Sequence, residues 1–288
     1  MNELHVGRGI TRGGLTVFPV WSTTSNTSRY STGVRHLDVA ECEEGPDVST
    51  LMVGNTGDRP LLVLEGQLFE GGWQHRMATR SVLIGVHQRV PVEVACVEHG
   101  RWGGSPRQAS RGRRATAYVR DAVRAASVGA GDVQGEVWDR VASHTRGTDN
   151  ETGSLVRRLD AAVPPEADAF EVLAGQCGVL IGVGGQPILL EVFDSPRTLR
   201  AQFRAIVEAA SLDATMAPAV ATPSRRAHRF VERFERVSLE ESGDAGLGRC
   251  LTGRSETVDA SGVRWDERDL HVRASYLRHP MLVAGGAL

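Results

Sequence analysis

The chain has 288 residues and a mass of 31.0 kDa, enough for one large domain or two closely associated ones. Its hydrophobic content of 41% and charged content of 24% are those of an ordinary globular protein, and a net charge of -2 argues against bulk attraction to nucleic acid or membranes. All 33 basic residues are arginine, which excludes mechanisms that need lysine, such as Schiff-base chemistry or a Walker-type phosphate lysine.

The cysteine pattern and the hydropathy indicate a protein of the reducing cytoplasm. The cysteines are far apart and form no C-x-x-C pair: Cys42, Cys96, Cys177 and Cys250. The first residues carry no apolar signal core, and no apolar run approaches the roughly 18 residues of a membrane span. We therefore expect reduced thiols, a cytoplasmic location and no membrane contact.

The front of the chain is typical of strands, with a Ser/Thr-rich loop at residues 22–32. β-branched runs punctuated by turn residues predict strands at residues 15–20, 35–40, 50–53, 61–64 and the two halves of 81–97. Arginines without an intervening acid follow at Arg107, Arg111, Arg113 and Arg114. A flexible basic linker is the simpler interpretation. The alternative is that these arginines close over an anionic ligand held by Arg101.

Helical spacing then takes over. Apolar periodicity predicts helices over residues 115–126, after Asp132, around 155–159, and from Pro165 through Phe170 and Leu173. A hairpin at residues 178–183 and 187–193 turns at Gly184-Gly185, and further helices open at Ser195-Pro196 and at Ser224.

The last strong pattern is an alternation over residues 270–276, which predicts a strand whose polar residues His271, Arg273 and Ser275 form one solvated face. Together the elements indicate an α+β fold. We expect a β-rich sheet or sandwich with short helices packed on one face, and a C-terminal portion of hairpin, helix and strand.

Two polar blocks flank the strands of residues 81–97, and such strand ends are where sites are built. The first runs from Glu65 to Arg76 and the second from Cys96 to Trp102. Glycines allow close backbone approach, arginines bind phosphate oxygens with two donors, indoles stack on bases, and carboxylates accept ribose hydroxyls or act as general bases. The catalytic candidates are Glu65 and Glu98; the ligand-binding candidates are Gly71, Gly72, Gln74, Arg76, Arg101 and Trp102.

Each of these residues also has a purely structural interpretation. Glu98 with Arg101, or Glu65 with Arg76, can form buried ion pairs that fix strand ends. Cys96 lies in a strand interior, where cysteine is usually a small hydrophobe. His75, Glu98 and His99 are poorly spaced for chelation on a strand, so we expect no metal, and no motif calls for a cofactor.

The motifs LxVFPV (15–20), LEGQLFEGGWQHR (64–76), ACVEHGRW (95–102), VQGEVW (133–138) and LLEVFDSPRTLRAQFRAIVEAASLDA (189–214) resemble the ARG and Rhodanese-Phosphatase-superfamily-associated protein domain family. The resemblance implies one large domain over residues 15–277, with a β-rich front (15–102), a mixed back (115–277), and tails at 1–14 and 278–288. It adds Gln134 and Trp138 to the motif positions and implies a role near NAD-derived or ADP-ribose chemistry.

Three functions remain open. The preferred one is a binding domain for a phosphorylated, nucleotide-like small molecule. The second is a hydrolase that acts on such a ligand through Glu65 or Glu98, and the third is a protein-interaction scaffold. A protein partner or a homo-oligomer is possible, and nucleic acid is an improbable partner.

Overall fold

A computed structural model describes residues 3–23, 28–43, 45, 47–129, 131–162 and 169–283. The chain divides into two compact units. Unit 1 combines Met1–Arg29 with Pro164–Leu288, and unit 2 is the continuous segment Tyr30–Val163. The strand predicted at residues 15–20 therefore belongs to a different unit from the other front strands.

Unit 2 is built on a closed six-stranded barrel with the strand order β10-β5-β4-β11-β7-β8. Its strands are β4 (Leu37–Ala40), β5 (Thr50–Asn55), β7 (Leu68–Gly71), β8 (Arg76–Ala78), β10 (Arg89–Cys96) and β11 (Arg107–Ala109). Alternate side chains of these strands, such as Val39, Val53, Phe69 and Val92, fill the interior. A separate pair, β6 (Leu61–Val63) and β9 (Val82–Ile84), adds to the same core, and a short 3-10 helix, η1 (Val34–His36), precedes β4.

Three helices complete unit 2: α1 (Ala117–Gly129), α2 (Val133–Thr145) and α3 (Leu155–Ala161). The Asp132 carboxylate accepts the backbone N–H of Gln134, and Ser154 caps α3 in the same way through Arg157. α2 packs on α1 and on the barrel strand β10. The helices predicted in this region are confirmed.

Unit 1 is an antiparallel nine-stranded sheet in which β2 pairs with β3 beside the path β1-β3-β12-β13-β17-β16-β15-β14. Its strands are β1 (Leu4–Val6), β2 (Ile10–Arg12), β3 (Leu15–Ser22), β12 (Gly178–Val183), β13 (Gln186–Phe193), β14 (Glu240–Ala245), β15 (Gly248–Arg254), β16 (Val258–Trp265) and β17 (Arg268–Tyr276). The predicted β12–β13 hairpin is confirmed, with Gly184 and Gly185 both at positive φ.

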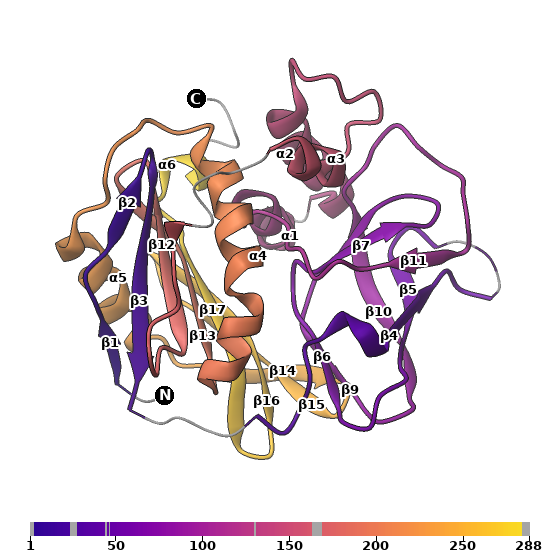
Figure 1. The fold of residues 1–288 in the computed structure, drawn as a ribbon, viewed down its shortest axis with the longest axis horizontal. Helices are drawn as coiled ribbons and strands as arrows, with labels where there is room; N and C mark the ends of the chain where they lie inside the picture. Colours follow the sequence, from indigo (N-terminus) through magenta and orange to yellow (C-terminus); the bar gives the residue numbers. More distant parts are fainter. Residues whose placement is uncertain are drawn as a thin grey trace. The chain divides into compact units, whose positions relative to one another are not determined.

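Helices α4 (Pro196–Ala214) and α5 (Ser224–Glu235) cover this sheet, and Figure 1 shows α4 running beside strands β12 and β13. α5 buries Phe230 and Phe234 in one core with Phe18 and Val20 of β3. Val17 points the other way and shares a pocket with Phe203 of α4. Because neighbouring strand residues face opposite sides, α4 and α5 lie on opposite faces of the sheet. A short helix, α6 (Pro280–Val283), follows β17.

The predicted α+β class is confirmed, and two local predictions are wrong. Within the described residues, the segment 169–175 is not an α-helix: Trp21 donates to the carbonyl of Ala174, and the Gln176 side chain accepts from the Leu173 N–H. These partners replace helical hydrogen bonds. Residues 165–168 of the same prediction lie outside the described residues.

The predicted solvated face of the last strand is also wrong. His271, Arg273 and Ser275 are all buried, on the face of the sheet opposite Val272 and Ala274, which pack in the core with α5. His271 Nε2 lies 3.1 Å from the carboxylate of Glu191 on β13, so the polar face meets a polar partner inside the protein. None of the described helices is both long and apolar enough to cross a membrane.

Candidate functional site

Strand pairing brings the two polar blocks together. The first block is itself a strand, a turn and a strand, formed by β7 and β8, and β10 pairs with β8 so that Cys96 lies opposite Arg76. The Gln74 amide donates to the carbonyl of Glu98 at 2.9 Å, and the His75 N–H donates to the Glu98 carboxylate at 3.1 Å. Residues far apart in the chain thus form one end of the barrel, which we call the barrel mouth.

Glu98 is almost fully buried and accepts four hydrogen bonds. One carboxylate oxygen accepts from the His75 N–H and from two nitrogens of Arg101, Nε at 3.0 Å and Nη2 at 2.7 Å. The other oxygen accepts the Thr152 hydroxyl at 2.7 Å. Burial opposes ionisation of Glu98, but the hydrogen bonds from Arg101 and Thr152 outweigh it and hold its pKa below the ordinary value. Glu98 is therefore an ionised anchor.

Arg101 uses all five of its N–H donors within the protein. Besides the two nitrogen contacts with Glu98, it donates to the carbonyls of Gly71 at 3.1 Å, Gly72 at 2.7 Å and Gly103 at 3.1 Å. Such a guanidinium clamps the β7–β8 turn from outside. In this arrangement Arg101 is suited to positioning its neighbours, and a phosphate would have to displace an existing acceptor.

The glycines of the β7–β8 turn allow the Gln108 side chain to pack closely against the turn backbone. Gly71 and Gly72 both have positive φ, and the Gly71 N–H donates to Nδ1 of His75 at 2.8 Å. A Cβ atom on Gly72 would lie 2.5 Å from the amide nitrogen of Gln108. The turn therefore depends on glycine because Gln108 packs directly against its backbone.

Inside the mouth lies a buried polar cluster of Arg76, Glu41 and Gln108. Arg76 is fully buried and lies opposite the core residue Phe69, so its side chain points into the barrel. Its Nη2 lies 3.8 Å from Oε2 of Glu41, and its Nη1 donates to the Gln74 carbonyl at 3.3 Å. Oε1 of Glu41 accepts the Gln108 amide at 3.1 Å.

Three buried atoms of this cluster have no hydrogen-bond partner among the described residues: Nε of Arg76, Oε2 of Glu41 and Oε1 of Gln108. A buried polar group without a partner costs roughly 1–3 kcal/mol, and more when it is charged. The mouth therefore holds a donor and two acceptors that a bound molecule could satisfy.

Two indoles flank the cluster. The guanidinium carbon of Arg76 lies 5.6 Å from the ring centroid of Trp102, and Trp73 meets Trp102 edge-on at 5.5 Å. Trp102 is 51% exposed, which is unusual for so large an apolar side chain. An indole with one face on a buried cation and a second surface in solvent can stack on a planar ligand.

Glu65 is not brought to the mouth. Its carboxylate lies 3.4 Å from Nε of Arg120 on α1, and its carbonyl accepts Arg114 at 2.6 Å. The sequence blocks thus contribute one catalytic candidate, Glu98, to the mouth and place the other beside α1.

The basic segment after Trp102 is ordered into the barrel instead of forming a flexible linker. Gln108 on β11 pairs with both β4 and β7. Arg107 forms an ion pair with Asp38 at 3.1 Å. Arg111 and Arg113 both contact Glu70 and Asp160.

Gln134, the helical motif residue, completes the barrel at this end. Its amide oxygen accepts the Cys96 N–H and its amide nitrogen donates to the Cys96 carbonyl, both at 2.8 Å. Burial raises the pKa of the Cys96 thiol to about 11, although Arg76 acts in the opposite direction. Cys96 is therefore a protonated, buried side chain with little nucleophilic character.

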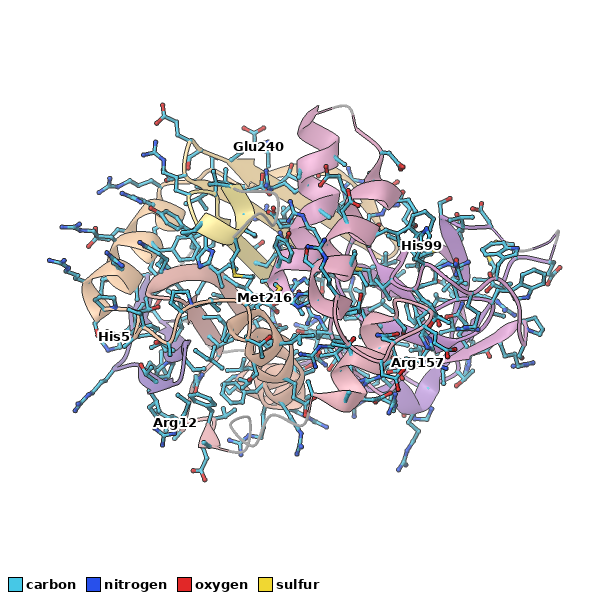
Figure 2. The ribbon with its side chains drawn as sticks, turned by 90° about the horizontal axis from the view of Figure 1, so that it is seen from above. His5, Arg12, His99, Arg157, Met216 and Glu240 are labelled. Carbon is cyan, nitrogen blue, oxygen red and sulfur yellow. The ribbon has the colours of Figure 1, made fainter. Side chains whose placement is uncertain are left out.

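The histidines of the region have structural partners. Burial lowers the pKa of His75, although the Glu98 carboxylate opposes this shift. His99, labelled in Figure 2, meets Trp138 of α2 edge-on with ring centroids 4.6 Å apart. Across the described part of the chain, no group of three or more His, Cys, Asp or Glu residues is placed to hold a metal ion.

Sequence reasoning did not identify Glu41 or Gln108 as site residues. Glu41 begins an acidic loop, and Gln108 sits in the arginine-rich segment that was interpreted as a linker. Only the alternation Val39, Glu41, with Val39 in a strand, could have indicated that Glu41 faces inward.

Comparison with known proteins gives one match. No curated protein and no solved structure is detectably similar to the chain. A family model matches residues 3–275, which include both units and the residues of the barrel mouth. The chain therefore belongs to the family described as ARG and Rhodanese-Phosphatase-superfamily-associated Protein domain.

Proposed function

We propose that the barrel mouth binds a phosphorylated, nucleotide-like small molecule derived from NAD or ADP-ribose. The observation that carries the proposal is the buried cluster of Arg76, Glu41 and Gln108, in which three atoms have no hydrogen-bond partner within the described part of the chain and the Arg76 guanidinium lies beside the exposed indole of Trp102. Unpartnered buried polar groups need an explanation, and a bound ligand is one that fits this chemistry.

The ligand class follows from what each group requires. Nε of Arg76 needs an acceptor such as a phosphate oxygen, and Oε2 of Glu41 needs a donor such as a ribose hydroxyl. Trp102 is half exposed and offers a face for a base. The family description, which records association with ARG and rhodanese-phosphatase superfamilies, supports the same ligand class.

Binding is favoured over hydrolysis because neither predicted glutamate is placed as a general base. Glu98 accepts four hydrogen bonds from protein groups, which leaves little room to orient an attacking water. Glu65 is ion-paired with Arg120. In this proposal, Glu98 and Arg101 hold the turn that carries Gln74 and Arg76.

The test is ligand titration followed by thermal unfolding and by tryptophan fluorescence, with ADP-ribose, NAD and AMP as probes. We expect ADP-ribose to raise the melting temperature and to change the indole emission, because Trp102 contacts the ligand. Trp102→Ala should weaken the affinity by tenfold or more, and Glu41→Gln, which preserves side-chain volume, should also weaken it.

Trp265→Ala is the matched control, because it removes another partly exposed indole from β16 of unit 1. It should leave the affinity unchanged. The proposal is contradicted if none of the three compounds stabilises the protein, or if Trp102→Ala binds ADP-ribose as tightly as the wild type. Recovery of intact ADP-ribose after incubation is expected; its turnover would favour the hydrolase alternative.

A further inference from the structure

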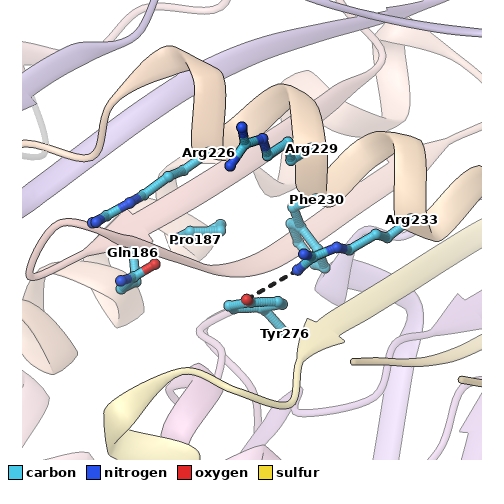
Figure 3. A pocket seen from close by; sticks show the side chains of 7 residues that line it. All are labelled: Gln186, Pro187, Arg226, Arg229, Phe230, Arg233 and Tyr276. Carbon is cyan, nitrogen blue, oxygen red and sulfur yellow. Dashed lines mark hydrogen bonds between the residues drawn. The ribbon is translucent and has the colours of Figure 1, made fainter. Parts of the chain in front are cut away.

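The strongest feature outside the barrel mouth is a stripe of arginines on α5 of unit 1. Arg226, Arg229 and Arg233 follow the spacing i, i+3 and i+7, so they project from one side of the helix. The neighbouring stripe of the helix, with Phe230 and Phe234 among others, is buried in the core and fixes the helix in place. Figure 3 shows the three side chains along α5 beside the first residues of β13.

These arginines line a pocket with a volume of about 130 Å³. Its other walls are Gln186 and Pro187 of β13, Phe230 of α5 and Tyr276 of β17. No carboxylate lines it, and within the described ranges none of the three guanidinium groups lies within ion-pair distance of an acid. Three arginines thus line a hollow that has no carboxylate among its lining residues.

Two of the three guanidinium groups are already oriented. Arg233 donates from Nη1 to the Tyr276 hydroxyl at 3.0 Å, the contact drawn as a dashed line in Figure 3. Its guanidinium carbon also lies 5.6 Å from the centre of the Tyr276 ring. Arg226 donates to the carbonyl of Gly185 at 2.5 Å. Because these contacts use one N–H each, the remaining donors of each planar fork can turn to a ligand at a reduced entropic cost.

The acids of α5 do not neutralise the pocket. Glu235 accepts the backbone N–H of Leu4 at 2.8 Å, and neither it nor Glu232 lines the cavity. The chain carries a net charge of only -2, so this local excess is not a property of the whole surface. A cluster of unpaired arginines disfavours folding by mutual repulsion, and a bound anion would remove that penalty.

We propose that this pocket is a binding site for a compact phosphate-bearing anion, a phosphomonoester or a diphosphate group. Its volume is well below the roughly 300 Å³ at which drug-sized ligand pockets begin, which favours a small anion or the phosphate end of a larger molecule. Three guanidinium forks match the several oxygens and multiple charges of phosphate better than a single carboxylate. The Gln186 amide and the Tyr276 hydroxyl supply further polar contacts.

This site goes beyond the proposed function, because it lies in unit 1 and uses none of the residues of the barrel mouth. The test is isothermal titration of the full chain with pyrophosphate and inorganic phosphate, with acetate as the monocarboxylate comparison. We expect pyrophosphate to bind more tightly than phosphate, acetate to bind least, and the affinity to fall as ionic strength rises.

Variants assign the binding to the pocket. Arg229→Gln should weaken pyrophosphate binding by tenfold or more, because it removes one positive charge from the pocket lining. Arg229 is exposed, so its replacement does not disturb the core. Arg233→Gln should weaken it as well. Arg225→Gln is the matched control: it removes an exposed arginine from the same helix that does not line the pocket, and the affinity should stay within twofold.

The proposal is overturned if pyrophosphate does not bind, or if Arg225→Gln and Arg229→Gln weaken it equally, which would indicate diffuse attraction to the helix. It is also overturned if a single-stranded oligonucleotide binds through Arg229 while pyrophosphate does not, which would make the stripe a nucleic-acid surface. Trp102→Ala must retain pyrophosphate binding, so failure of the barrel mouth as a ligand site and failure of this pocket give different results.

Discussion

At the scale of single residues, Glu98 is the charge on which the barrel mouth depends. It joins the backbone of the β7–β8 turn to Arg101 and to Thr152, which precedes α3. Removing one partner of a buried ion pair costs roughly 3–5 kcal/mol, because the other charge keeps its desolvation penalty. Arg101 is partly exposed, so the loss at this site falls toward the lower end of that range.

We therefore expect Glu98→Gln to destabilise the protein by about 3 kcal/mol at neutral pH. Chemical unfolding, monitored by tryptophan fluorescence, measures this loss of stability. Thr152→Val, which removes one hydrogen bond from a neutral donor to the same ionised carboxylate, should cost about 1.5 kcal/mol. If Glu98→Gln unfolds at the wild-type denaturant concentration, the network around Glu98 contributes nothing to stability.

The same residue predicts a pH dependence. Because the pKa of Glu98 is lower in the folded protein than in the unfolded chain, its stabilisation is complete above the unfolded pKa, near 4.5. It is lost as pH falls through the lower, folded pKa. The stability difference between wild type and Glu98→Gln should therefore shrink from pH 6 toward pH 3. A constant difference over that range would assign the effect of the substitution to packing instead of charge.

The cysteines give a second prediction at this scale. Cys96 and Cys177 are buried and their pKa values are raised by burial, whereas Cys42 and Cys250 are partly exposed. We expect a thiol-alkylating reagent at pH 8 to modify Cys42 and Cys250 first, because the thiolate is the reactive form and access is required. Peptide mass spectrometry over time measures the order. Early modification of Cys96 in native protein would show that the barrel end opens readily.

At the scale of elements, the end of β10 depends on a side chain from α2. β10 pairs with β5 only as far as Glu93 and Thr50, and beyond this point the Gln134 amide takes both backbone groups of Cys96. A side chain thus continues the ladder where the neighbouring strand has ended.

Gln134→Ala should therefore destabilise the protein by about 2–4 kcal/mol, since it leaves two partly buried backbone groups without partners. Asp132→Ala, two residues earlier at the N-cap of the same helix, removes only an exposed cap and should cost about 1 kcal/mol. Denaturant unfolding of both variants measures the difference. Equal costs would indicate that Gln134 acts only through the helix.

At the scale of the whole molecule, the two units differ in which parts of the chain each needs in order to fold. Unit 2 is one continuous segment that closes its own barrel and has its own core. Unit 1 needs both ends of the chain, because β3 pairs with β12 and supplies Phe18 and Val20 to the core around α5.

We expect residues 30–163 to fold when expressed alone, and residues 164–288 to fold only when residues 1–29 are supplied. Far-ultraviolet circular dichroism and dispersion of the amide NMR spectrum measure folding of each fragment. A disordered 30–163 fragment, or an independently folded 164–288 fragment, would contradict this account of the architecture. Unit 2 should fold without the rest of the chain because its closed barrel has no unpaired strand edge. Removal of β3 from unit 1, in contrast, exposes the edge of β12.

Much of the local structure could be predicted from the chain because its causes lie within a few residues. Gly184-Gly185 permits positive φ and so determines a tight hairpin; Asp132 and Ser195 cap the helices that follow them; and apolar spacing identifies the buried face of α5. The two motif blocks were also recognisable, because polar residues concentrate in them on either side of the apolar run at residues 81–97.

The partners of those polar residues were decided only by the tertiary structure. The sequence does not distinguish Glu65 from Glu98, but in the fold Glu98 forms an ion pair with Arg101 and Glu65 forms one with Arg120. His271 alternates like a solvated residue, yet it is buried against the carboxylate of Glu191 on β13. Glu41 and Gln108 meet Arg76 only when the barrel closes. Backbone conformation responds to neighbours in the chain, whereas burial and ion pairing depend on contacts between distant residues, so sequence pattern determined the elements and the fold determined the sites.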